Sequence, residues 1–142
     1  MNNQKMSAHD YLSQAYRIDQ RINSKLEQVI SLRSLAEKAK STLSKTPKAK
    51  DKNLHYMEDI VIKMVDLESE INRDLNRLID LKHEIMTMVK CVELVELQTL
   101  LEMRYLSFKS WEQIAVELHF ELRHVYRLHG KALSEVDIIR RT

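Results

Sequence analysis

Apolar residues recur at alternating steps of three and four through two long stretches of this chain, and this spacing constrains the fold more than any other feature. The first stretch extends from about Ser7 to Leu43, and the second from about Leu54 to Val92. Such steps place side chains on one face of an α-helix, whereas a strand requires alternation at every second residue. Each stretch therefore predicts a helix of roughly 38 residues, roughly 57 Å long.

A polar joint separates the two predicted helices. It covers about residues 44–53 and contains Pro47, which removes a backbone donor and disfavours helix at Thr46. Two helices of equal length with matching apolar stripes predict an antiparallel hairpin over residues 1–92. Several apolar residues lie off the two stripes, namely Ile30, Leu35, Val61, Val65 and Ile79. We therefore expect the hairpin to pack against a partner, most simply a second copy in a dimer.

Composition excludes several classes of protein. The chain has one Gly and one Pro in 142 residues, too few for the turns of an all-β fold or for a glycine-rich phosphate loop. Cys91 is the only cysteine, so no intramolecular disulfide can form, and its neighbours predict a small core residue. No apolar run is long enough to span a bilayer, and the N-terminus does not resemble a signal peptide. We expect a soluble, cytoplasmic, all-α protein without membrane contact.

Charge is unevenly distributed, although the formal net charge is only +2. Residues 1–50 carry ten Lys/Arg and four Asp/Glu, a net of +6. Residues 51–92 carry six and nine, a net of −3, and residues 93–142 carry seven and eight, a net of −1. The opposite charges of the two long helices favour their lying side by side, although each exposed pair contributes only about 0–1 kcal/mol.

The last third, residues 93–142, predicts a separate domain of shorter helices. Ser110 and Gln113 form a capping box that starts a helix over Trp111–Leu118. The residues 119–121 form a tight joint, and a last helix begins near Leu122 with Val125 facing inward. A short helix with Ile-Ala in its second turn, a three-residue joint and a second helix follow the helix-turn-helix pattern.

Three stretches of this domain resemble sigma factor region 4. They are Leu100–Tyr105, Trp111–Leu118 and His124–Leu133, which follow the family's order and spacing. The whole chain resembles small phage and prophage proteins that open with a segment such as YLSQAYRIDQRI and end in a region-4-like module. That resemblance implies a phage transcriptional regulator of a bacterial host. It departs at His119, where the family usually has Gly, and at Glu121, where the helix cap is usually Ser or Thr.

The helical wheel of the last helix assigns the residues expected to contact double-stranded DNA. With Val125 and Leu128 inward, the outer face and its flanks carry Arg123, His124, Tyr126, Arg127 and Lys131. Arginine can read guanine or bind phosphate, and His124 and Lys131 suit phosphates. Trp111 begins the preceding helix, where its backbone amide can meet a phosphate. Gly130 costs roughly 1 kcal/mol inside a helix, which suggests close approach by another backbone or by DNA.

The function expected from the sequence is sequence-specific DNA binding in transcription regulation, with the hairpin dimerising or docking a partner such as RNA polymerase. Two alternatives stay open: an adaptor for phage DNA packaging or assembly, and a helix-turn-helix used only for protein interaction. No nucleophile with a base and an orienting group can be assembled, so we do not expect an enzyme. His119, His124 and His129 recur at steps of five and do not share a helix face, so no metal or other cofactor is expected.

Overall fold

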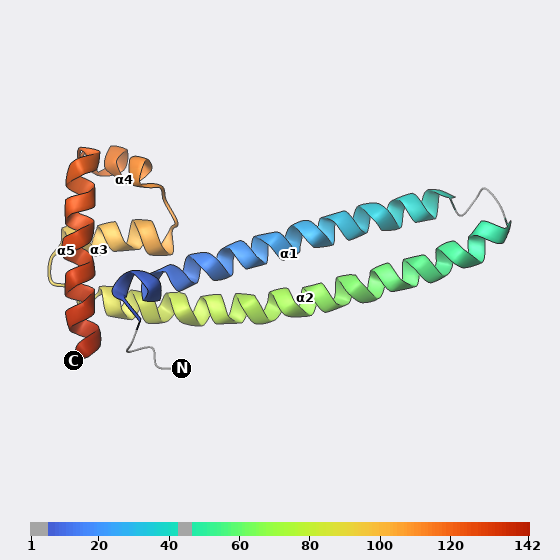
Figure 1. Ribbon diagram of the computed structural model, residues 1–142, viewed down its shortest axis with the longest axis horizontal. Coiled ribbons are helices and arrows are strands. Elements are labelled where there is room, and N and C mark those ends of the chain that lie inside the picture. Colours follow the sequence, from blue (N-terminus) through green and yellow to red (C-terminus); the bar gives the residue numbers. More distant parts are fainter. Residues whose placement is uncertain (1–5, 43–46) are drawn as a thin grey trace. The chain divides into compact units, whose positions relative to one another are not determined.

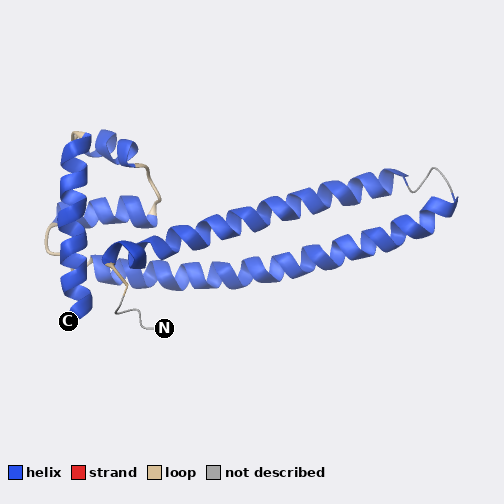
Figure 2. Cartoon of the chain, viewed as in Figure 1, coloured by secondary structure: helices blue, strands red, loops and turns tan. Residues whose placement is uncertain are grey.

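A computed structural model describes residues 6–42 and 47–142, and helices account for most of them. The elements are α1 (Ala8–Thr42), α2 (Pro47–Val89), α3 (Val95–Leu101), the π-helical turn η2 (Glu102–Leu106), α4 (Trp111–Leu118) and α5 (Leu122–Arg141) (Figure 1). The described residues contain no strand (Figure 2). The prediction of an all-α fold is therefore confirmed.

The chain divides into two compact units. The middle unit is Asp19–Arg77, and the terminal unit joins the residues up to Ile18 with Leu78–Thr142. The division predicted from the sequence, at residue 92, differs from this one. The regular apolar spacing ends near Glu93, which placed the predicted boundary there. The observed boundaries differ because both long helices continue beyond the middle unit and contribute their ends to the terminal unit.

The middle unit is a pair of helical segments that run side by side in opposite directions (Figure 1). Their facing stripes bury Ile22 and Val29 of α1 and Ile60 and Ile71 of α2. Lys25 Nζ lies 2.6 Å from Asp74 Oδ2 between the helices, with side-chain exposures of 13% and 11%. This hydrogen bond from Lys25 lowers the pKa of Asp74 below its usual value, and it fixes the register of the two segments at that level.

Three details of the long helices differ from the sequence-based expectation. The second helix begins at Pro47 rather than near Leu54, because proline is well tolerated in the first turn of a helix; residues 43–46 of the predicted loop lie outside the described residues. The steps of three and four that predict the two helices place Leu26 and Leu75 on their apolar stripes, but both side chains are exposed. Cys91, predicted to be a core residue, is exposed because α2 ends at Val89 and the turn buries Val92 instead.

The terminal unit has a continuous apolar core. Its most deeply buried side chains come from α1 to α5 and from the turn after α2: Leu12, Ile85, Val89, Val92, Leu97, Leu100, Leu101, Ile114, Val125 and Val136. The first turn of α1 and the last turns of α2 therefore belong to the same core as α3–α5.

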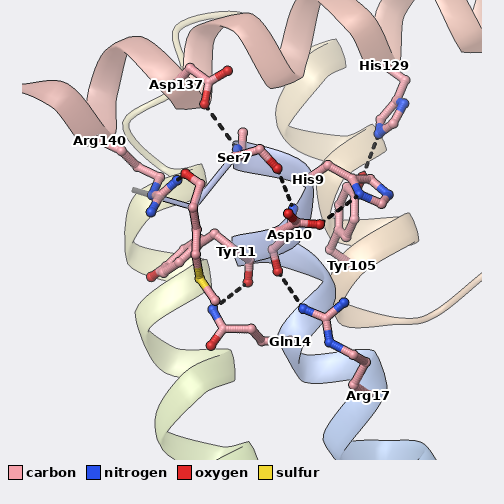
Figure 3. Close-up of polar contacts among 12 residues, drawn as sticks. Ser7, His9, Asp10, Tyr11, Gln14, Arg17, Tyr105, His129, Asp137 and Arg140 are labelled. Carbon is pink, nitrogen blue, oxygen red and sulfur yellow. Dashed lines mark hydrogen bonds and ion pairs between the residues drawn. The ribbon is translucent and has the colours of Figure 1, made fainter. Parts of the chain in front are cut away.

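Polar contacts connect the beginning of α1 to the end of α5 (Figure 3). Ser7 caps α1 by accepting a hydrogen bond from the Asp10 amide (3.1 Å), as the sequence pattern of Ser7 followed three residues later by Asp10 indicates. The backbone amide of Ala8, the residue after Ser7, donates a hydrogen bond to Asp137 Oδ1 of α5 at 3.0 Å. Arg140 of α5 donates to the Met6 carbonyl at 2.7 Å and lies 4.4 Å from the ring centroid of Tyr11. These contacts fix the C-terminal half of α5 against α1.

Candidate nucleic-acid interface

α4 has the bounds that the sequence predicted, and α5 begins at the predicted residue, Leu122. Ser110 Oγ accepts the Gln113 amide at 3.2 Å and so starts α4. His119 ends it in the left-handed conformation (φ 59°, ψ 40°), where its amide reaches the Val116 carbonyl at 3.3 Å. Glycine is the usual residue for this conformation, and histidine is among the side chains that adopt it more readily. The three residues 119–121 then turn the chain into α5.

α5 has a fully buried side that determines which residues it exposes. Val125, Leu128, Ala132 and Val136 are buried at steps of three and four. This register leaves Arg123, Tyr126, Arg127, Gly130 and Lys131 exposed. Because Arg123, Arg127 and Lys131 are four residues apart, they form one row of cations along the helix, with successive residues rising by roughly 6 Å.

The structure places the remaining predicted DNA-contacting residues around this row. His124 is half-buried, packs edge-on against Phe120 with ring centroids 4.7 Å apart, and accepts a hydrogen bond at Nδ1 from Arg127 Nη2 (2.6 Å). Tyr126 is 48% exposed and meets Trp111 edge-on, with ring centroids 5.7 Å apart. The structure thus brings Trp111 together with Tyr126, and His124 together with Arg127.

Trp111 is also the centre of a cluster that sequence reasoning missed. The guanidinium of Arg104 lies 4.4 Å from the centroid of the Trp111 ring, and the His129 ring lies 4.4 Å away on α5. Tyr105 Oη lies 2.6 Å from His129 Nε2 (Figure 3), and the donor in this hydrogen bond depends on the histidine tautomer. No local sequence pattern predicts the contact of Tyr105 with His129, which are 24 positions apart, because it arises only when η2 packs against α5.

Burial changes the protonation of this cluster. Removal of the His129 imidazole from water lowers its pKa to about 4, and the nearby charges of His9 and Arg104 act in the same direction. Burial likewise raises the pKa of Tyr105 to about 12. Both rings are therefore neutral at pH 7, so the positive charge on this part of α5 comes from Arg123, Arg127 and Lys131.

The N-cap of α5 and one residue within it, both singled out by the sequence, have simple environments. Glu121 occupies the N-cap position with extended backbone (φ −70°, ψ 148°), but its side chain makes no capping hydrogen bond. A Cβ placed on Gly130 would meet nothing within 4 Å. Within the described chain, therefore, no backbone approaches Gly130 closely, which removes the intramolecular explanation for a glycine at this helix position.

The described residues contain neither a cluster of metal ligands nor a membrane-spanning helix. Among residues 6–42 and 47–142, no group of three or more His, Cys, Asp or Glu side chains is arranged to bind a metal ion. Over the same residues, none of the helices combines the length and the apolar character that crossing a bilayer requires. The arrangement around α5 exposes cationic side chains, together with polar aromatic side chains, along one helix.

The fold and this surface define an all-α protein in which one terminal helix exposes a row of cations. One family model, described as protein of unknown function (DUF1492), matches residues 38–137. The match covers 100 of the 142 residues, and the chain therefore belongs to that family. Comparison with curated proteins and with solved structures finds no match.

Proposed function

We propose that this protein is a sequence-specific DNA-binding regulator of transcription, of the phage or prophage type, which inserts α5 into the major groove of double-stranded DNA. The observation that carries the proposal is the exposed row of Arg123, Arg127 and Lys131 on a helix whose other side is buried. An α-helix fits the major groove, and arginine can bond the O6 and N7 atoms of guanine at once.

The two halves of α5 support this proposal in different ways. The C-terminal half is attached to α1 through Asp137 and Arg140. The N-terminal half, which carries the row of cations, follows directly from the tight turn after α4. A recognition helix needs both features, because its exposed end must enter the groove while its other end is positioned rigidly.

The acidic residues of the terminal unit limit how DNA can approach. Glu112 and Glu117 are exposed on α4, although Lys109 compensates Glu117 through an ion pair of 2.7 Å. Glu121 precedes the row of cations without a partner in a capping bond. DNA binding by this surface depends on local cations rather than on net charge, so we expect affinity to decrease with added salt.

The test is a fluorescence titration of the full chain with duplexes selected from random DNA, repeated at several salt concentrations. Arg123→Ala and Arg127→Ala should each weaken binding by about 1–3 kcal/mol if the side chain reads a base. A lost sequence preference identifies base reading, and a uniform loss with a shallower salt dependence identifies phosphate contact. Arg73→Ala removes the same charge from an exposed position in the middle unit and should leave binding unchanged.

A footprint on the phage genome separates this function from its alternatives. A protected site upstream of late genes supports the regulator, in the cytoplasm of a bacterial host and near RNA polymerase. A site at a packaging start would instead indicate a packaging adaptor. Absence of binding to any selected duplex, with wild-type and variant proteins equally inactive, would overturn the proposal in favour of a protein-interaction module.

A further inference from the structure

The middle unit exposes large apolar side chains on both of its helices. Ile30 of α1 is 65% exposed, and Val61 and Val65 of α2 are 53% and 54% exposed. Further exposed members of this set are Leu26, Leu54 and Leu75. Single exposed apolar residues need no explanation, but a contiguous set on a pair of helices marks an interaction surface.

Helix geometry places these side chains on one face. Each residue advances by about 100° around the axis, so Ile30 lies about 100° beyond the buried Val29. On α2, by the same rotation, Val61 and Val65 lie about 80° and 120° from the buried Ile71, in the same sense. Because the two segments are antiparallel, equal senses of rotation direct the side chains to the same face of the pair. We call this set, Leu26, Ile30, Leu54, Val61, Val65 and Leu75, the apolar face.

The opposite face of the middle unit is polar. A hollow there is lined by Gln28, Ser31, Leu32, Lys63 and Leu67. On α1, the adjacent residues Ile30 and Ser31 therefore mark the two different faces. The exposed apolar side chains thus lie on one face of the helical pair. Such a distribution is typical of a pair that packs this face against another protein surface, and not of a pair that functions alone.

We propose that two copies of this chain pair through the apolar face, so that two helical pairs form a four-helix bundle. From Leu54 to Leu75 the face extends for roughly 32 Å, and two adjacent helices are roughly 20 Å wide. A face of roughly 600 Å² approaches the roughly 800 Å² that each partner buries in a stable dimer.

The charges around the apolar face also suit a second copy. Arg33 of α1 and Glu58 of α2 lie at its edges by the same helix geometry, and Glu37 and Glu68 lie within its arc, so the face and its edges carry both signs. A symmetric interface contacts itself, and a surface with both signs can pair with its own copy, whereas a basic partner needs a uniformly acidic border. These four residues give each copy a net of two negative charges at the interface, which predicts that added salt strengthens the association.

The experiment is sedimentation equilibrium of the full chain without DNA, with two matched variants. Ile30→Arg places a charge on the apolar face, and Ser31→Arg places the same charge at the next residue, on the polar face. The wild type and Ser31→Arg should sediment as dimers, and Ile30→Arg should weaken the association at least about tenfold, equivalent to about 1.4 kcal/mol. Val65→Arg tests the α2 side of the face in the same way, and far-ultraviolet circular dichroism establishes that each variant is folded.

A folded wild-type monomer at all concentrations would overturn the proposal, as would equal association of Ile30→Arg and Ser31→Arg. Association that weakens with salt would also contradict it, because that result indicates a contact between opposite charges. The inference does not depend on DNA binding. A monomeric Ile30→Arg that still binds a short duplex would separate the two surfaces, and a dimer that binds no DNA would leave the apolar face supported while refuting the function of α5.

Discussion

His129 makes the stability of the terminal unit depend on pH between about 6.5 and 4. Its pKa is about 4 in the folded protein, compared with 6.5 for an ordinary histidine. The unfolded chain therefore binds a proton at a higher pH than the folded chain does. The free energy of unfolding contains the whole contribution of neutral His129 above pH 6.5 and loses it progressively as the pH falls toward 4.

The size of the effect follows from this difference in pKa. One pKa unit corresponds to about 1.4 kcal/mol, so the full difference sets an upper limit of about 3 kcal/mol. The His129 ring is only partly buried, and solvent screening reduces this figure to about 1–2 kcal/mol. The Asp74 carboxylate does not affect this comparison. Its hydrogen bond with Lys25 holds its pKa below 3.8, so its contribution to the free energy of unfolding is lost only at a lower pH.

The assay is urea unfolding at pH 7 and pH 4.5, followed by the fluorescence of Trp111, the single tryptophan of the chain, which contacts the His129 ring. His129→Gln retains a side chain that can bond Tyr105 but cannot titrate, so its loss of stability between the two pH values should be smaller by about 1–2 kcal/mol. His55→Gln changes an exposed histidine and should behave as the wild type does. Equal losses in the wild type and His129→Gln would refute the assignment.

Two substitutions, one at the N-cap of α5 and one within the helix, test the local energetics of the proposed recognition helix. Glu121→Ser should raise the free energy of unfolding by about 0.5–1 kcal/mol, because serine at the N-cap accepts a backbone amide that Glu121 leaves without a side-chain partner. It should also tighten binding to many duplexes, and weaker binding to the selected site alone would show that Glu121 reads a base. Gly130→Ala should stabilise the fold by about 1 kcal/mol, since a Cβ there meets nothing within 4 Å. A lower melting temperature for Gly130→Ala would contradict that account.

Local signals allowed the helices to be predicted closely. The capping bonds at Ser7 and Ser110 are made by the atoms that the capping signals indicated, because a cap involves residues only three positions apart. The register of α5 also followed from its apolar spacing, and Arg123 and Arg127 are exposed for that reason. Information of this kind is contained within one or two helical turns and does not depend on the rest of the fold.

Features that depend on tertiary packing could not be predicted in this way. The contact between Tyr105 and His129 arises from the packing of η2 against α5. The contact of Ala8 with Asp137 joins residues 129 positions apart. The exposure of Cys91 followed from where α2 ends, which apolar spacing alone indicated only to within a few residues. In each case the pattern identified the helix but not its neighbour.

Because α5 is attached to α1, residues 93–142 depend on residues 1–92 for the position of α5. Residues 93–142 contain all the cations of the proposed recognition surface, yet the core that orients α5 also includes Leu12 of α1 and Ile85 and Val89 of α2. Removing residues 1–92 would expose that core and break the bonds of Asp137 and Arg140 to α1. The unit that the proposed DNA binding requires is therefore the terminal unit, which is assembled from both ends of the chain. An insertion between Asp19 and Arg77 can change the apolar face while leaving the environment of α5 intact.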